Sequence, residues 1–147
     1  IVGAGPAGAS LALLLARCGT DVSLLEQDTT FERVFRGEGL MPAGMDALHQ
    51  MGLTALFTKV PSRKLESWNI HLGGEEVFVI PEPDLGKNSL SVVSQPALLQ
   101  GIIDEASQYE GFEFQPGCKV QDLLWGNGRV VGVRVKTESG LSEIYAD

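Results

Sequence analysis

The amino-acid sequence predicts an α/β fold in which a parallel sheet is joined to antiparallel strands. The first observation is the order of patterns at the start of the chain: a strand end, a glycine-rich turn, an apolar helix pattern and a second short strand. Strands and helices that alternate in this order are typical of a parallel sheet. The second observation is that the C-terminal part holds several β-like runs separated by glycine-containing turns, which predicts an antiparallel meander.

The glycine-rich turn has the sequence pattern Gly3-x-Gly5-x-x-Gly8. This spacing is typical of a dinucleotide-binding turn. The first glycine permits the tight turn, the second lets a pyrophosphate approach the backbone, and the third lets the helix pack closely on its strand. Small residues interleaved with leucines over residues 6–18 predict a helix that lies against a sheet, and Pro6 suits its first turn. The N-terminus of this helix would therefore face the phosphates.

An acidic residue follows at the distance expected for a carboxylate that holds ribose hydroxyls. Gly19 is expected to end the helix, and residues 21–26 form a second short strand that ends in Glu26. A glycine triplet alone is weak evidence, because glycines occur in many loops. The order of strand, turn, helix, strand and acid favours nucleotide binding. An ordinary βαβ unit without a ligand is the alternative.

The middle of the chain is expected to hold a helix and then a β excursion. Pro42 begins a helix pattern that continues to Met51, with Gly52 as its stop. Two β-like runs meet at a glycine pair, which predicts a hairpin, and a third run follows; they cover residues 68–72, 77–80 and 89–93. Large apolar side chains alternate along the hairpin, which favours core positions over the lining of a pocket; they are Trp68, Phe78 and Ile80.

The C-terminal part is expected to complete the parallel sheet and add the meander. Pro96 opens an apolar helix pattern, and residues 111–115 form a candidate third parallel strand that ends before Pro116-Gly117. The three runs of the meander follow at short spacing; they cover residues 119–125, 129–136 and 141–146.

Composition narrows the class of protein. The 147 residues can form one domain with a core, and 44% apolar content fits a soluble globular protein. The net charge of −8 argues against a nucleic-acid surface. No apolar run approaches the roughly 20 residues of a membrane span, and no signal sequence opens the chain, so we expect a cytoplasmic protein. Cys18 and Cys118 lack metal-ligand spacing, and we expect free thiols and no metal site.

With these motifs and two further ones, Arg36-Gly37-Glu38 and Ser94-Gln95-Pro96, the chain resembles the N-terminal part of the para-hydroxybenzoate hydroxylase family of FAD-dependent monooxygenases. The resemblance covers essentially the whole chain. It implies a Rossmann-like FAD-binding fold of the glutathione-reductase type. Residues 1–60 and 94–147 would bind FAD, residues 61–93 would begin a β-rich substrate region, and both ends of the chain would be cut from a longer protein.

The resemblance also implies the residues that hold FAD. They are Gly3, Gly5, Pro6, Ala7, Gly8, Glu26, Gln27, Arg36, Gln95 and Val120. The Arg36 guanidinium would lie along the pyrophosphate and ribityl chain, Gln95 against the flavin chain, and the backbone of Val120 against the adenine. A helix N-terminus stabilises an anion by only about 0.3–1 kcal/mol when exposed, so a guanidinium is a natural second contact. The alternatives are a solvated charge for Arg36, and a helix cap or an exposed side chain for Gln95.

The function that the resemblance implies is the oxidation of a small, aromatic or polycyclic molecule with O2 and with NADPH or NADH. FAD would supply the chemistry and the protein would position and shield it, so no catalytic acid, base or nucleophile is expected in this chain, which alone would be inactive. Glu38 is expected to be a loop cap, with a carboxylate on the ligand side as the alternative, and His49 and His71 are expected to be surface or core residues. The alternatives are an FAD-dependent isoprenoid reductase or halogenase, an NAD-dependent dehydrogenase, and a noncatalytic nucleotide-binding module.

Overall fold

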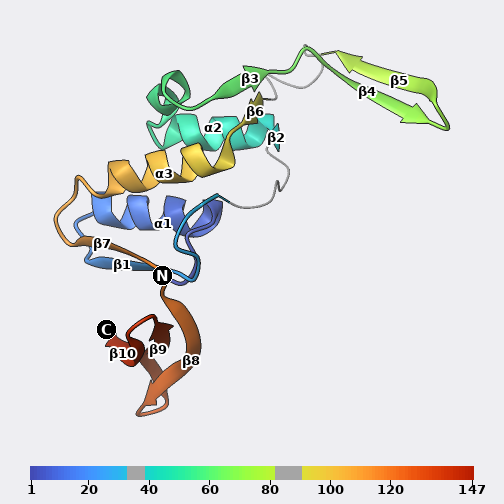
Figure 1. The fold of residues 1–147 in the computed structure, drawn as a ribbon. Helices are drawn as coiled ribbons and strands as arrows, with labels where there is room; N and C mark the ends of the chain where they lie inside the picture. The colour runs from blue at the N-terminus through green and yellow to red at the C-terminus, as the bar shows by residue number, and fades with distance from the viewer. Residues whose placement is uncertain (33–38, 82–90) are drawn as a thin grey trace. The chain divides into compact units, whose positions relative to one another are not determined.

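The computed structural model describes residues 1–32, 39–81 and 91–147 (Figure 1). The chain forms two compact units. The first comprises Ile1–Glu32 and Ile102–Asp147, and the second comprises Arg33–Gly101. Arg36 and Glu38, on which two of the expectations above rest, lie outside the described residues.

The first unit is built on a short parallel sheet, as the sequence predicts. Strand β1 (Val22–Glu26) pairs in parallel with β7 (Phe112–Pro116), from Val22↔Phe112 to Glu26↔Pro116. On its other side β1 meets the start of the chain, where Val2 forms a parallel bridge to Leu25. The spatial order is therefore third strand, second strand, first strand, which is the order of one half of a dinucleotide-binding sheet.

Helix α1 (Pro6–Arg17) covers one face of this sheet. Its buried side chains are mostly small, which lets the helix backbone approach the strands; they are Ala9, Ala12, Leu13 and Ala16. Strand β1 is buried along most of its length, with Leu24 and Leu25 at 0% and 3% exposure. A strand covered on both faces is expected to be nearly continuously apolar, and the run Leu24-Leu25 follows that rule.

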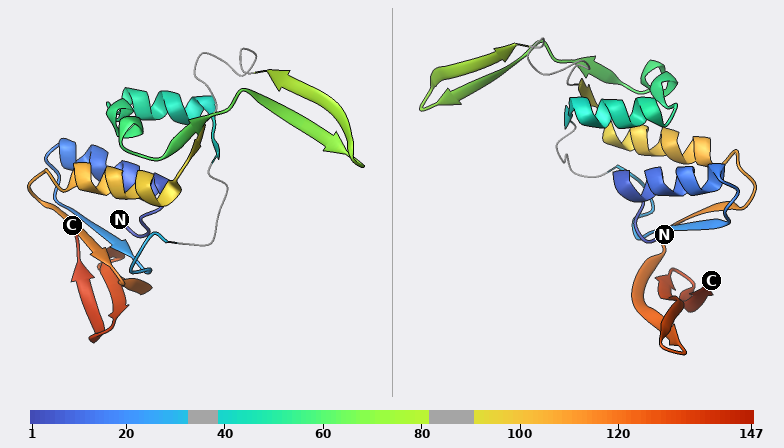
Figure 2. Two further views of the ribbon diagram at one scale, coloured as in Figure 1. Left: turned by 45° about the horizontal axis from the view of Figure 1, so that its top comes forward. Right: turned by 180° about the vertical axis from the view of Figure 1, so that it is seen from behind.

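The second face of the sheet is covered by the predicted meander (Figure 2). Its strands β8 (Lys119–Gly126), β9 (Arg129–Thr137) and β10 (Gly140–Tyr145) are antiparallel in the order β10-β9-β8. The inward side chains pack on Leu25 of β1 and on one another; they are Cys118, Val120, Val133, Val135 and Ile144. This contact fixes the start of β8 against the C-terminal end of β1.

The second unit contains a small antiparallel sheet and a helix. Strands β2 (Gly39–Leu40), β6 (Ser91–Val93) and β3 (Ser62–Lys64) lie in the order β2-β6-β3. Between them in sequence are helix α2 (Pro42–Gln50) and the short 3-10 helix η1 (Thr54–Thr58). Helix α3 (Gln95–Ala106) begins in this unit and ends in the first. The predicted helix from Pro42 is confirmed.

The hairpin of the second unit corrects one expectation. Strands β4 (Ser67–Leu72) and β5 (Glu75–Pro81) pair as predicted, with both turn glycines at positive φ. Trp68 and Phe78, however, are 39% and 51% exposed, and Ile80 is only partly buried, so the core assignment is wrong. Alternation predicts burial only where another layer covers the strands. Within the described part of this unit, most of the hairpin's side chains are exposed on both faces.

Among the described residues, no helix has both the length and the apolar content needed to cross a bilayer.

Candidate dinucleotide-binding site

The three glycines of the turn have three different structural roles. Gly3 has φ +92°, a conformation that L side chains rarely adopt. A Cβ on Gly8 would overlap the carbonyl oxygen of Gly3, so the third glycine is required for the helix to pack on the turn. Gly5 has an ordinary φ of −68°, and a Cβ built on it meets nothing within 4 Å. The protein fold therefore needs glycine at positions 3 and 8 and leaves open space at position 5.

That open space lies at the N-terminus of α1. Gly5 is the N-cap and provides no side-chain hydrogen bond to the helix, and Pro6 has no N–H. The N–H of Ala9 already donates to the carbonyl oxygen of Gly5 (2.9 Å), whereas the N–H groups of Ala7 and Gly8 belong to the first turn and have no acceptor within the helix. Such groups, together with the helix dipole, stabilise an anion.

Glu26 lies beside the same turn with its carboxylate held by two backbone groups. Its side chain is buried, at 5% exposure. One carboxylate oxygen, Oε2, accepts a hydrogen bond from the N–H of Ala4 (2.8 Å), and Oε1 accepts one from the N–H of Asp28 (3.1 Å). An ionised carboxylate has about four acceptor positions, so its oxygens can accept hydroxyl donors as well. The arrangement can bind a ribose whose diphosphate lies at the helix N-terminus.

The start of β8 is attached to the backbone around Glu26. The N–H of Cys118 donates to the carbonyl oxygen of Glu26 (2.7 Å), and the N–H of Gly117 donates to that of Asp28 (3.2 Å). Val120 follows two residues later, partly buried and paired with Val135. Gln27 is exposed. The first unit thus brings together the glycine turn, Glu26, Gln27 and the start of β8.

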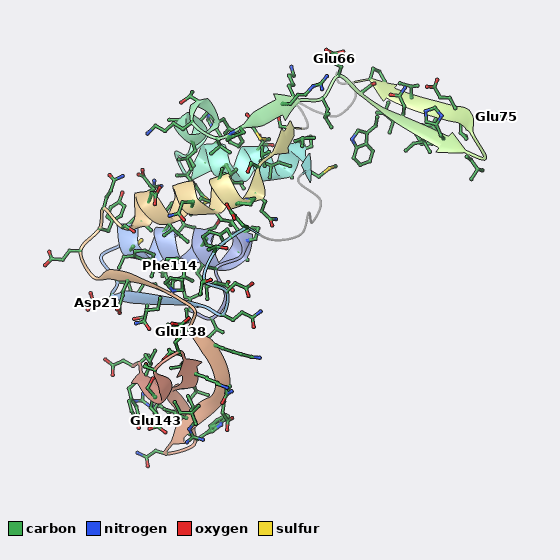
Figure 3. All side chains as sticks on the ribbon, in the orientation of Figure 1. Asp21, Glu66, Glu75, Phe114, Glu138 and Glu143 are labelled. Atoms are coloured by element: carbon green, nitrogen blue, oxygen red, sulfur yellow. The ribbon has the colours of Figure 1, made fainter. Side chains whose placement is uncertain are left out.

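An aromatic contact holds the segment that leaves β1. Phe31 stacks on Phe114 of β7, which is labelled in Figure 3; the ring centroids are 5.9 Å apart and the interplanar angle is 14°. Phe31 is buried at 8% exposure, so the stack anchors the chain that follows residues 26–28 to the parallel sheet. Offset aromatic pairs of this kind contribute about 0.5–1.5 kcal/mol beyond the burial of their area.

Gln95 is described within the second unit. It is the first residue of α3 and partly buried. The helix is capped by the residue before it: the N–H of Leu98 donates to the carbonyl oxygen of Ser94 (2.9 Å), and the N–H of Ala97 approaches Ser94 Oγ at 3.5 Å. The capping role that was the alternative for Gln95 therefore belongs to Ser94.

Perturbed pKa values are found for groups on β10 and in the turn before β8. Glu143 of β10, which is labelled in Figure 3, accepts hydrogen bonds from the Tyr145 hydroxyl (2.8 Å) and from Arg134 Nη2 (3.1 Å), and both lower its pKa. The same bond raises the pKa of Tyr145. Burial raises the pKa of the Cys118 thiol.

Other candidate features do not form a reaction centre in the described part of the chain. His49 and His71 are exposed, and no group of three potential metal ligands is found among the described residues. The first unit has a cavity of about 770 Å³ beside Val2 and the meander, and neither the glycines of the turn nor Glu26 line it. The cavity is distinct from the nucleotide site.

Sequence reasoning missed the groups that orient Glu26. They are the backbone N–H groups of Ala4 and Asp28, together with the Gly117-Cys118 turn. Backbone donors have no signature in the residue types. Only the turn itself was recognisable, as a Pro-Gly pair.

A parallel sheet in the order third, second, first strand, with a glycine turn at the helix N-terminus and an acid at the end of the second strand, defines a Rossmann-like dinucleotide-binding domain. The chain belongs more specifically to the FAD binding domain family, whose model matches residues 1–147. The resemblance to the FAD-dependent monooxygenases of the para-hydroxybenzoate hydroxylase type is thereby confirmed.

Two curated relatives are monooxygenases. The chain is 30% identical over 138 residues to 6-methylpretetramide 4-monooxygenase of Streptomyces rimosus, covering 90% of this chain and 32% of the relative. It is 29% identical over 152 residues to squalene monooxygenase SE2 of Panax ginseng, covering 99% of this chain and 27% of the relative. The chain thus spans about a third or less of the length of these proteins.

Solved structures share the fold. The p-nitrophenol 4-monooxygenase PnpA of Pseudomonas putida DLL-E4 matches with a TM-score of 0.81 at 21% identity, over 97% of this chain and 37% of that one. A geranylgeranyl bacteriochlorophyll reductase-like protein of Thermoplasma acidophilum matches with a TM-score of 0.82 at 18% identity, over 99% and 36%. The myxobacterial chondrochloren halogenase CndH matches with a TM-score of 0.74 at 24% identity, over 99% and 34%. At these identities the likeness concerns the fold.

Proposed function

We propose that this chain binds the ADP half of FAD and that the protein containing it is a flavin-dependent monooxygenase. The observation that carries the binding proposal is the open space beside Gly5. Gly5 is the one glycine of the turn whose side-chain space is open and whose φ is ordinary, and that space adjoins the uncapped first turn of α1. A pyrophosphate that approaches the backbone there explains a glycine that the fold itself does not require.

The described residues fit the nucleotide in two places. The N–H groups of Ala7 and Gly8, with Pro6 at the helix start, would bind the pyrophosphate, and the oriented carboxylate of Glu26 would bind the adenine ribose. Gln27 and the backbone of Val120 would lie against the adenosine. When bound, FAD supplies the redox chemistry, while these residues bind and orient it. In the proposal Arg36 and Gln95 contact the rest of the cofactor.

The activity of the whole protein is proposed from its relatives. Those at 29–30% identity are monooxygenases, which supports oxidation of a small organic molecule with O2 and with NADPH or NADH. Residues 1–60 and 94–147 would form the FAD-binding part, and residues 61–93 would lead toward the substrate. A reductase or halogenase remains the second candidate, because such proteins share the fold. The unpaired thiols of Cys18 and Cys118 support a reducing, cytoplasmic location.

The binding proposal is tested by cofactor release. The purified protein is incubated with FAD and NAD⁺ together, separated from unbound ligand, denatured, and its released nucleotides are identified by chromatography. We expect FAD at close to one equivalent per chain and little NAD⁺. Release of NAD⁺ in place of FAD would refute the proposal and favour a dehydrogenase. Consumption of NADPH or NADH with uptake of O2 then distinguishes a monooxygenase from a reductase.

A further inference from the structure

A tight turn between β7 and β8 contacts the backbone of residues 26–28, which form the Glu26 loop. Gly117 occupies this turn with φ +70°. Its N–H donates to the carbonyl oxygen of Asp28 (3.2 Å), and the next N–H, of Cys118, donates to that of Glu26 (2.7 Å). The backbone from residue 26 to residue 28 is therefore held at both of its ends by one turn.

The held segment carries a donor that orients the Glu26 carboxylate. The N–H of Asp28 lies between the two anchored carbonyl groups and donates to Glu26 Oε1 (3.1 Å). Since a peptide unit is planar, the position of the Asp28 carbonyl and the direction of its neighbouring N–H groups depend on the same few dihedral angles. A shift of the turn would move the Asp28 N–H and rotate the carboxylate.

We propose that Gly117 is a positioning residue for the Glu26 carboxylate and thereby sets the recognition of the ribose hydroxyls. The proposal rests on the proposed function, in which Glu26 binds the adenine ribose. A side chain at position 117 would meet two obstacles. The positive φ disfavours L residues, and a Cβ would lie 3.2 Å from Cγ2 of Thr29, one residue beyond the anchored Asp28 carbonyl. The turn, the loop or the Thr29 side chain must then move, and the strain of the positive φ acts on the turn itself.

The test compares ADP with 2′,3′-dideoxy-ADP by titration calorimetry on the whole protein. Hydrogen bonds from ribose hydroxyls to a carboxylate are of the charged kind, so the native protein should prefer ADP by about 10- to 100-fold. Gly117→Ala should reduce this preference at least fivefold. Its affinity for the dideoxy ligand should change less than twofold, because the pyrophosphate contacts at α1 are untouched.

Gly128→Ala is the matched control. Gly128 lies in the β8–β9 turn with a similar φ of +77°, and a Cβ there meets nothing within 4 Å. It incurs the same kind of backbone strain without touching the Glu26 loop. We expect a fall in Tm and an unchanged preference for ADP, which separates positioning from general destabilisation.

Two further variants keep the proposal testable if Gly117→Ala does not fold. Asparagine tolerates positive φ, so Gly117→Asn should fold with a reduced preference, and adding Thr29→Ser, which removes Cγ2, should restore part of it. An unchanged ADP preference in the Gly117 variants would overturn the proposal. If the native protein binds FAD but shows no preference for ADP over the dideoxy ligand, both the Gly117 proposal and the ribose role of Glu26 are overturned. FAD binding itself is then not refuted.

Discussion

Replacing Gly5 with serine should stabilise the fold and weaken FAD binding. The φ of −68° and ψ of −179° are those of an ordinary helix N-cap, and the space around the Cβ is open. Serine is a better N-cap than glycine by a few tenths of a kcal/mol, and a side chain in a compatible conformation adds about 0.4–1 kcal/mol through the unfolded state. Gly5→Ser should therefore stabilise the protein without ligand by about 0.5–1.5 kcal/mol, a rise in Tm of roughly 1–5 °C.

The same substitution should weaken FAD binding. The serine Oγ would accept the N–H of Ala7 or Gly8, which the pyrophosphate needs, and would occupy its path to the backbone. A hydrogen bond to a charged group contributes about 1.5–3 kcal/mol, so each bond lost should weaken binding by about 10- to 100-fold. The measurements are calorimetric unfolding of the protein without ligand and titration of FAD followed by flavin fluorescence.

Gly8→Ala is the comparison for this experiment. It likewise adds a Cβ in the same turn, but this Cβ would overlap the Gly3 carbonyl oxygen. Overpacking of this kind costs about 1–3 kcal/mol or more, so this variant should lose stability and FAD binding together. A Gly5→Ser protein that bound FAD as tightly as the native one would refute the placement of the pyrophosphate. A Gly5→Ser protein that unfolded as readily as Gly8→Ala would refute the open space at Gly5.

Three other outcomes are expected. Glu26→Gln keeps the shape of the side chain but removes its charge, and should weaken FAD binding by about 10- to 100-fold in the fluorescence titration; equal affinity would exclude the ribose contact. Hydrogen bonds lower the pKa of Glu143 in the folded state from its ordinary 4.5, so its stabilising effect is present above that pH and disappears as the pH falls through the lowered pKa. Glu143→Gln should thus lower Tm at pH 7 and leave it unchanged near pH 2, and a difference that persisted in acid would contradict this. Cys18 is exposed, whereas burial both covers Cys118 and raises its pKa, so a thiol reagent should modify Cys18 quickly in the native protein and Cys118 only on unfolding; two fast thiols would contradict the burial.

Much of the fold could be predicted because its signals are local. The helix after the glycine turn, the glycine-joined hairpin and the meander all depend on neighbouring residues, through positive φ at turns and the period of apolar side chains. The hairpin also shows where such reasoning fails. The exposed Trp68 and Phe78 show the same alternation as core residues. The alternation of apolar side chains distinguishes the two faces of a strand but does not show whether another layer covers either face.

The residue types are enough to predict the kind of site, because the βαβ order with Gly3, Gly5, Gly8 and Glu26 depends on short-range chemistry. How that site is held depends on contacts that form when the chain folds. The parallel pairing of β1 with β7 brings the Gly117 turn, some ninety residues later in the sequence, onto the Glu26 loop. The structure also distinguishes Gly8, which the fold requires to be glycine, from Gly5, where the fold leaves space for a side chain. Both results depend on contacts between backbone groups in the folded chain, and the type of a single residue does not predict such contacts.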